Sequence, residues 1–269
     1  MSAAIGDSAP LTVLITGASS GIGEALARQF AQAGHHLVLV ARSSDKLKSL
    51  ARALAAEHGV KARVATADLA LPGAAATLAA AMKRARRPID VLVNNAGVVA
   101  HGAFTATSAQ RHQQLIDLNV SGLTAMLAQF VPAMVARGHG RVLNVASIAA
   151  FQPVPSLATY AATKAYVLSL TESLSEELRG TGVTISALCP GITATNMLAT
   201  AQQGSAQLSK LPGFMVGDVA TVAKDGYEAC MRGEVIKVPG VLNLATMLAS
   251  RATPKWLLRR VSGALARKL

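Results

Sequence analysis

The stretch that decides the fold is TGASSGIG, residues 16–23. It follows an apolar run of strand length, residues 11–16, and opens a stretch of helical periodicity. Gly17 permits a tight turn, Gly21 lets the backbone approach a pyrophosphate, and Gly23 allows the helix to pack on the sheet. The N-terminus of such a helix favours phosphate. A purely structural turn is the alternative. The predicted phosphate-binding loop comprises Gly17, Ser19, Ser20, Gly21, Ile22 and Gly23.

Beyond this loop, apolar runs of strand length alternate with longer stretches of helical period. Strands are predicted at 11–16, 37–40, 60–66, 91–94, 142–145, 183–188 and 235–238. Helices are predicted at 23–33, 44–57, 73–86, 110–136, 157–179 and 218–232. Strands that are apolar throughout indicate a parallel sheet covered on both faces. The sequence therefore predicts one α/β domain with a doubly wound, Rossmann-like sheet.

Bulk composition narrows the class of protein. The 269 residues are 51% hydrophobic and have no basic start followed by an apolar run, so we expect no secretory signal. No apolar run is long enough to span a bilayer, which predicts a cytoplasmic protein. Cys189 and Cys230 lack a C-x-x-C spacing and the histidines do not cluster, so neither a disulfide framework nor a metal site is predicted.

The net charge of +12 fits nucleic acid, a membrane surface or an anionic ligand. Six basic and no acidic residues lie in 251–269, so half of the excess belongs to this short tail. With 3% aromatic residues and no recognised motif, a nucleic-acid partner is not expected.

The end of the second predicted strand bears on the choice of cofactor. An NAD site usually has an acidic side chain there, whereas this chain has Ala41 followed by Arg42. Ala41 removes the repulsion of a 2′-phosphate, and the planar guanidinium of Arg42 suits that group. NADP(H) is therefore favoured over NAD(H). An exposed Arg42 without a ligand is the alternative, and Asp45 is expected in the first turn of the next helix rather than on a ribose.

Polar residues follow the third and fourth strands, at the edge where open sheets bind ligands. Asp68 and Leu69 end one strand, and Asp68 can accept from an adenine amino group or serve a turn. Asn94-Asn95-Ala96-Gly97 ends the other, where the two asparagines can hold the loop and each other or contact the cofactor. Asn95, Ala96 and Gly97 are predicted to be cofactor-binding.

Tyr160 and Lys164 are four residues apart and share one face of a predicted helix. A chance surface pair is one interpretation. The other is chemical, because a nearby cation lowers the pKa of a phenol from its ordinary value of about 10. Such a tyrosine exchanges a proton near neutral pH.

Taken together, these residues resemble the short-chain dehydrogenase/reductases. The shared pattern is Gly17-x-x-x-Gly21-x-Gly23, Asn94-Asn95-Ala96-Gly97, Ser147, Tyr160-x-x-x-Lys164 and Pro190-Gly191, in order between Leu11 and Pro239. The resemblance implies a Rossmann-like domain of about seven parallel strands. It also implies NAD(P)-dependent oxidoreduction of a carbonyl or alcohol and assembly as a homodimer or homotetramer.

The family's catalytic set falls on Asn119, Ser147, Tyr160 and Lys164. Tyr160 would supply the proton and Ser147 a hydrogen bond to the developing oxyanion. Lys164 would lower the pKa of the tyrosine and donate to the nicotinamide ribose. Asn119, a poor helix former, predicts a local departure from the helix with a bound water in a proton relay. Past the sixth strand, the resemblance places a nicotinamide loop containing Pro190, Gly191, Ile192 and Thr195.

The substrate is predicted from the residues expected around the nicotinamide, which include a loop at about 192–216 that would form a lid. The expected apolar set is Val99, Phe104, Phe151, Val154, Leu157, Met197, Leu198 and Phe214. This set suits a small hydrophobic ketone or secondary alcohol. A 3-oxoacyl thioester reductase and a nonenzymatic NADP(H)-binding sensor are the alternatives.

Residues 241–269 are predicted as a basic helical tail after a catalytic domain of residues 1–240. Leu257, Leu258, Val261 and Leu265 lie toward one helical side, and Arg259, Arg260 and Arg267 largely on the other. Such a helix fits peripheral contact with an anionic membrane, or docking on its own protein or a sister subunit.

Overall fold

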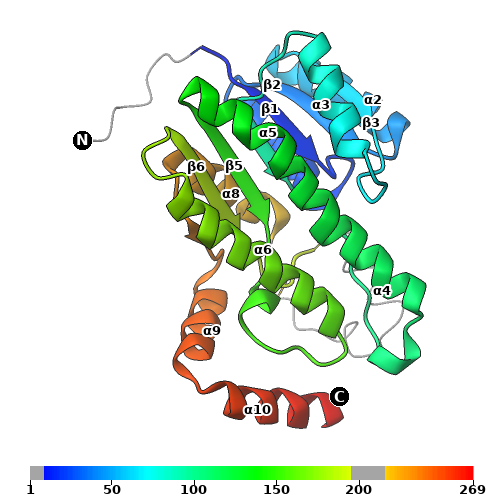
Figure 1. Ribbon diagram of the computed structural model, residues 1–269, viewed down its shortest axis with the longest axis vertical. Helices are drawn as coiled ribbons and strands as arrows, with labels where there is room; N and C mark the ends of the chain where they lie inside the picture. The colour runs from blue at the N-terminus through cyan, green and yellow to red at the C-terminus, as the bar shows by residue number, and fades with distance from the viewer. Residues whose placement is uncertain (1–8, 195–215, 269) are drawn as a thin grey trace.

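The computed structural model describes residues 9–194 and 216–268, with side chains described to residue 264. Within these residues, seven parallel strands form one sheet in the order β3-β2-β1-β4-β5-β6-β7 (Figure 1). The strands are β1 (Thr12–Thr16), β2 (His36–Ala41), β3 (Ala62–Thr66), β4 (Val91–Asn94), β5 (Gly140–Val145), β6 (Val183–Leu188) and β7 (Ile236–Lys237). The doubly wound α/β fold predicted from the sequence is confirmed.

Helices cover both faces of the sheet (Figure 1). One face carries α1 (Gly21–Gln32), α2 (Ser44–His58) and α8 (Val219–Arg232). The other carries α3 (Ala74–Arg84), α5 (Leu123–Arg137) and α6 (Ala158–Glu177). The remaining described helices are η1 (Phe104–Ala106), α4 (Ala109–Ile116), η2 (Asp117–Gly122), η3 (Ile148–Phe151), α9 (Val241–Ala252) and α10 (Lys255–Lys268).

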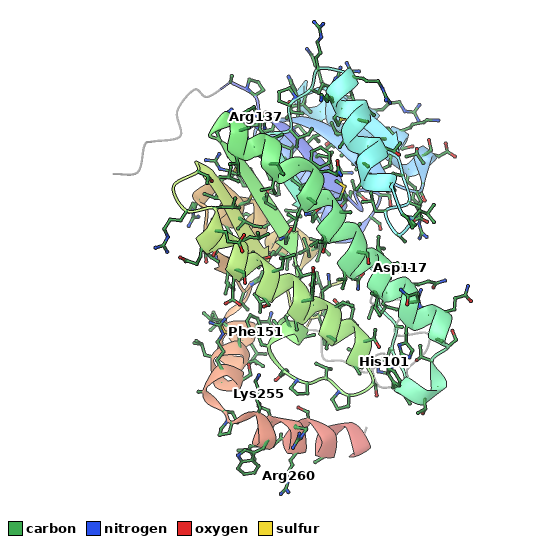
Figure 2. All side chains as sticks on the ribbon, in the orientation of Figure 1. His101, Asp117, Arg137, Phe151, Lys255 and Arg260 are labelled. Atoms are coloured by element: carbon green, nitrogen blue, oxygen red, sulfur yellow. The ribbon has the colours of Figure 1, made fainter. Side chains whose placement is uncertain are left out.

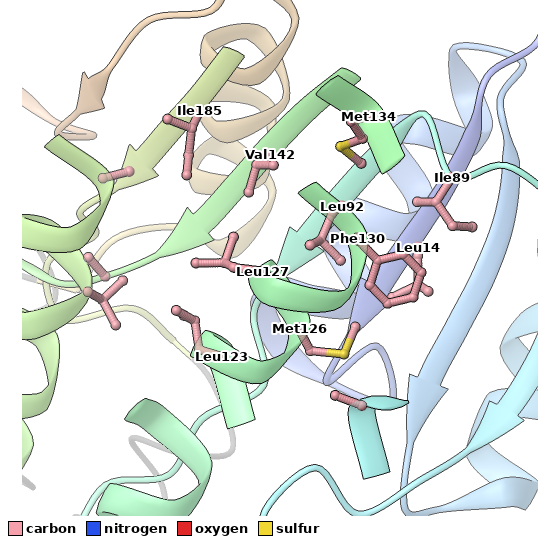
Figure 3. Close-up of a cluster of buried hydrophobic side chains, with 14 of the residues drawn as sticks. Leu14, Ile89, Leu92, Leu123, Met126, Leu127, Phe130, Met134, Val142 and Ile185 are labelled. Carbon is pink, nitrogen blue, oxygen red and sulfur yellow. The ribbon is translucent and has the colours of Figure 1, made fainter. Parts of the chain in front are cut away.

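The central strands β1, β2 and β4 are mostly apolar because each buries side chains in two separate layers. On β1, Leu14 packs beneath α5, whereas Val13 and Ile15 pack on the opposite face. Figure 3 shows the first layer, in which Leu14 and Phe130 lie close to Leu92. Burying a side chain of this size contributes about 1.5–3 kcal/mol. This burial holds the carboxyl ends of the strands in one line.

The helix expected at 110–136 is interrupted. α4 and α5 are joined by η2, a π-helical segment at Asp117–Gly122 whose first residue is labelled in Figure 2. A Cβ at Gly122 would lie 2.5 Å from the Leu69 carbonyl oxygen, so the widened turn passes directly against the loop after β3. The local departure predicted at Asn119 is confirmed, and π segments often mark functional sites.

This same run corrects the expectation that no segment is long and apolar enough to span a bilayer. Within Ala109–Arg137, an 18-residue stretch reaches a mean hydropathy of 1.4, and 44% of that stretch is buried. The apolar side chains of α5, including Leu127 and Phe130, belong to the layer shown in Figure 3. The hydropathy therefore reflects a core helix of the sheet.

Candidate active site

The predicted phosphate loop adopts the backbone that its glycines allow. Gly17 and Gly21 have φ angles of 66° and 59°, a backbone conformation that residues other than glycine rarely adopt. A Cβ at Gly23 would lie 2.4 Å from the Gly17 carbonyl oxygen and 2.3 Å from Asn95 Nδ2. Gly23 therefore packs α1 against its own turn and Asn95, where the sequence predicted packing on the sheet.

Thr16 and Asn95 hold this loop to the end of β4. Thr16 Oγ1 accepts from the backbone N–H groups of Asn95 and Ala96, each at 3.0 Å, and donates to the Val93 carbonyl. Asn95 Nδ2 donates to the carbonyl oxygens of Thr16 (2.9 Å) and Gly17 (3.2 Å). Thr16 was missed from the sequence, where a threonine before a glycine carries no distinct signal.

The expectation that Asn94 and Asn95 hold each other is wrong. Asn94 Nδ2 donates to Asn144 Oδ1 at 2.9 Å, and Asn144 Nδ2 donates to Thr171 Oγ1 at 2.9 Å. Successive strand residues point to opposite faces of a sheet, so Asn94 lies beneath the site while Asn95 lies in the loop above it. The buried chain from Asn94 to Thr171 links β4, β5 and α6.

Arg42 and Asp68 stand side by side at the ends of β2 and β3. Their closest N–O distance is 3.9 Å, and the Arg42 side chain is 72% exposed. Asp68 Oδ1 also accepts from the Ala70 backbone N–H at 3.1 Å, as the turn interpretation predicted. A pair this long and exposed is weak, so the guanidinium retains donors for an anion. Asp45 is fully exposed in the first turn of α2, near Lys48, as expected.

A cavity of about 520 Å³ runs along the carboxyl ends of the strands. Its lining includes these predicted residues: Gly17, Ser19, Ser20, Gly21, Ile22, Arg42, Asp68, Leu69, Asn95, Ala96, Gly97, Ser147, Tyr160, Lys164, Pro190, Gly191 and Ile192. Gly23 and Asn119 support this lining from behind. Thr195 lies outside the described residues.

The residues present fit a dinucleotide. The α1 N-terminus and the serines of the loop offer donors for a pyrophosphate at one part of the cavity. Arg42 offers a charged fork at the end of β2, beyond Ala41, which brings no carboxylate. Gly97 passes close to two polar side chains of the site, because a Cβ there would lie 3.3 Å from Asn119 Oδ1 and 3.5 Å from Lys164 Nζ.

Ser147, Tyr160 and Lys164 converge at the other part of the cavity. Ser147 precedes η3, and its Oγ accepts from the Ala149 N–H at 3.1 Å, which leaves the hydroxyl proton available to donate. Lys164 is 6% exposed and donates from Nζ to the Val145 carbonyl at 2.7 Å. The ammonium lies 5.8 Å from the centroid of the Tyr160 ring.

Burial controls the protonation of this pair. Burial raises the pKa of Tyr160 above its ordinary value, and the Ser147 hydroxyl acts in the opposite direction. Burial also lowers the pKa of Lys164 to about 8, against a smaller opposing influence from Cys189. The expectation that Lys164 lowers the pKa of Tyr160 is therefore not met in this structure, because both charged forms lose hydration.

Asn119 uses its side chain to hold the wall of the cavity. Oδ1 accepts from the Val98 N–H and Nδ2 donates to the Val98 carbonyl, each at 2.9 Å. Nδ2 also donates to Thr163 Oγ1 at 3.1 Å, which ties η2 to α6. The π segment turns this amide inward, next to Gly97. Thr163 was missed from the sequence.

The substrate end of the cavity is partly as predicted. Val99, Val154 and Leu157 line it, together with Leu118 and Ile148. Phe104 does not, because it is exposed and stacks on His112 at 4.3 Å. Phe151 turns instead toward the Arg251 guanidinium, 5.4 Å from its ring centroid. The predicted Met197, Leu198 and Phe214, and most of the 192–216 lid, lie outside the described residues.

Comparisons with known proteins agree with this geometry. The family model for short chain dehydrogenase matches residues 11–206. A putative ketoacyl reductase from Streptomyces coelicolor is 36% identical over 193 residues, which cover 71% of this chain and 73% of the relative.

Solved structures are similar over most of their length. A short-chain dehydrogenase from Sphingobium yanoikuyae in complex with NADPH is 34% identical, with a TM-score of 0.79 and coverage of 91% of this chain and 96% of the other. A bulky-bulky ketone specific alcohol dehydrogenase from Comamonas testosteroni is 31% identical, with a TM-score of 0.75 and coverage of 91% and 95%. A family member from Burkholderia phymatum in complex with NAD is 28% identical, with a TM-score of 0.78 and coverage of 88% and 92%. The chain described here belongs to the short-chain dehydrogenase family and is an oxidoreductase acting on CH–OH or C=O groups.

Proposed function

We propose that this protein is an NADP(H)-dependent reductase of hydrophobic ketones that also oxidises the corresponding secondary alcohols. The observation that carries the proposal is that Arg42, Ser147 and Tyr160 line one continuous cavity. The residue that would select the cofactor, Arg42, and the residues that would transfer the proton and orient the substrate, Tyr160 and Ser147, thus belong to a single site.

In this proposal the nicotinamide cofactor supplies or accepts the hydride. Tyr160 holds the proton that moves to or from the substrate oxygen, and Ser147 donates a hydrogen bond that fixes the position of that oxygen. Lys164 is anchored on Val145 and places a cation beneath the tyrosine. Asn119 positions Val98 and thereby the wall next to Gly97, and the relay water predicted at Asn119 stays a prediction.

The preference for NADP(H) rests on Arg42. A charge-assisted hydrogen bond contributes about 1.5–3 kcal/mol, so Arg42→Ala should weaken NADPH use roughly 10- to 100-fold. NADH lacks the 2′-phosphate and should be used equally well by both forms. Arg52→Ala is the matched control and should change neither, because Arg52 is an exposed arginine of α2 outside the lining of the cavity.

The proposal is tested with a panel of aliphatic, aryl and acyl ketones, supplied with NADPH and NADH in parallel. We expect turnover of apolar ketones with NADPH, because Val99, Val154 and Leu157 line the substrate end. Equal kcat/KM for the two cofactors would overturn the NADP(H) preference. Tight NADPH binding without turnover of any carbonyl would favour the sensor alternative.

A second candidate function is reduction of a 3-oxoacyl thioester. The observation in its favour is the similarity to the putative ketoacyl reductase of Streptomyces coelicolor. Including an acetoacetyl thioester in the panel separates the two functions, since a preference for it over simple ketones would support this second one.

We also propose a cytoplasmic homodimer or homotetramer. In support, Val135 of α5 and Tyr166 of α6 leave apolar surface exposed on neighbouring helices, where Tyr166 is hydrogen-bonded to Thr124 at 2.9 Å. Sedimentation velocity on the intact chain tests the assembly, and a monomer at micromolar concentration would contradict it.

A further inference from the structure

Among the described residues, the contacts that hold α9 to the domain lie on one side of this helix. On that side Met247 and Ser250 are buried, and Asn243 packs against Gly191, whose added Cβ would lie 2.5 Å from Asn243 Oδ1. Arg251 closes the contact through Glu172 at 3.0 Å. Because these residues fix the rotation of α9 about its axis, they also determine which side faces outward.

The outward side of α9 is apolar. Val241 is 86% exposed and Leu248 57% exposed, and Leu242 and Leu244 are exposed with them. Residues at positions i, i+3 and i+7 share a helical face, so Val241, Leu244 and Leu248 form one stripe. No described side chain covers this stripe, and an exposed apolar patch of this kind marks an interaction site.

α10 directly follows α9 in the chain and adds positive charge to this end of the molecule. Lys255, Arg259 and Arg260 are exposed on it, and Trp256, 56% exposed, lies beneath the Arg260 guanidinium with 5.9 Å to the ring centroid. Leu257 and Val261 are exposed as well. The sequence from 251 to 269 has six basic and no acidic residues. Exposed leucines, a tryptophan and unopposed cations are the composition of helices that lie on anionic membranes.

The position of these helices relates them to the cavity. Figure 1 shows α9 and α10 at the end of the molecule toward which the strand arrows of β1 and β5 point, and Figure 2 marks Lys255 and Arg260 along α10. α9 also contacts η3, the turn that Ser147 precedes. A surface bound by this end would lie near the mouth of the cavity.

We propose that α9 and α10 form a peripheral docking surface for anionic lipid headgroups, with the Val241–Leu244–Leu248 stripe inserted among the acyl chains. Charge decides between the possible occupants. A second copy that met this one through the same helices would place the six basic residues of each 251–269 segment against like charges, whereas the proposed assembly through α5 and α6 does not. An anionic lipid surface compensates the cations and covers the apolar stripe at the same time.

The test uses the intact protein in co-sedimentation with vesicles of phosphatidylcholine alone or with about a third phosphatidylglycerol. We expect binding to the anionic vesicles only, weakened by salt. Replacing Lys255, Arg259 and Arg260 by Gln should weaken binding on the order of 100-fold, since each cation near the surface contributes roughly a factor of five. Leu248→Gln should weaken it by a further measurable step without lowering Tm, because the side chain is solvent-exposed.

The matched control replaces three exposed cations elsewhere, Lys46, Arg52 and Lys83 on α2 and α3, by Gln. It removes the same net charge and should bind as the unmodified protein does. Equal losses in the two triple variants, or binding to neutral vesicles of equal strength, would overturn the proposal. So would an absence of vesicle binding combined with an oligomer that Leu248→Gln dissociates, since the stripe would then be covered by a second copy.

Discussion

A half-buried phenol and a buried ammonium share the wall of the cavity, and the loss of hydration disfavours the charged form of each. Because the pKa of Tyr160 is raised, the phenol is protonated at neutral pH. Protonated tyrosine is the form that gives a proton to a carbonyl oxygen, and tyrosinate is the form that takes one from an alcohol. The residue is thus prepared for reduction.

This direction predicts different pH profiles for the two reactions. Ketone reduction should vary little between about pH 6 and 7, because Tyr160 is already protonated, and should fall above pH 8, where Lys164, with its pKa lowered to about 8, loses its charge. Alcohol oxidation should rise by roughly tenfold per pH unit between about pH 6 and 7, because the phenolate fraction grows while the pH stays below the raised pKa of Tyr160. Steady-state kcat/KM in both directions measures this. An oxidation profile that levels off below pH 8 would show instead that the pKa of Tyr160 is lowered.

At the level of single residues, the sequence predicted the reacting side chains better than the residues that hold them in place through hydrogen bonds. Tyr160, Lys164 and Ser147 are recognisable because their residue types and spacing match a reaction. Thr16, Thr163 and Asn144 act through hydrogen bonds to residues far along the chain, such as Thr16 to Ala96. A polar side chain that is hydrogen-bonded to a distant part of the chain leaves no local sequence pattern. These three residues can therefore be identified only in the folded structure.

The element that positions the cofactor end is the turn between β1 and α1. Its shape depends on the contact of Gly23 with the Gly17 carbonyl and Asn95, which in turn is held to Thr16. There is no space for a side chain at Gly23, because the Gly17 backbone and the hydrogen-bonded Asn95 amide lie where its Cβ would be. The turn and the loop after β4 therefore form one unit.

From this contact we predict that Gly23→Ala weakens NADPH binding by at least tenfold and lowers stability by about 1–3 kcal/mol through overpacking. Titration of NADPH fluorescence and thermal unfolding measure the two effects. Gly34→Ala is the control. Gly34 has a φ angle of 82° with nothing within 4 Å, so the change should cost stability but leave NADPH binding unaltered. Unchanged NADPH affinity in Gly23→Ala would contradict the proposed role of the turn.

Elements with a strong period were predictable, and those shaped by tertiary contacts were not. The predicted bounds of β4 and β6 match those in the structure, since both strands are largely buried and rich in β-branched residues. η2 was predicted only as an irregularity, because its π geometry follows from Asn119 reaching Val98 and Gly122 passing Leu69. α9 was not separated from the tail, because its apolar positions lie on the outer side as well as the inner.

Across the whole molecule, the parallel sheet gathers segments that are distant in sequence. Arg42 follows β2, Ser147 follows β5 and Gly191 follows β6, and all three line the same cavity. This gathering was predictable, because parallel strands place their carboxyl ends at one edge. The substrate was less predictable, since Phe104 and Phe151 turn to His112 and Arg251 instead of the cavity.

The account depends on Tyr160 as the proton-transferring group beside a bound NADP(H). The most direct measurement compares Tyr160→Phe with Tyr166→Phe, an exposed tyrosine on the same helix, for ketone turnover and NADPH affinity. We predict that Tyr160→Phe lowers kcat/KM by roughly 100- to 10,000-fold while the NADPH Kd stays within about threefold, and that Tyr166→Phe changes neither. Turnover by Tyr160→Phe within about threefold of the unmodified protein would contradict the assignment of the site.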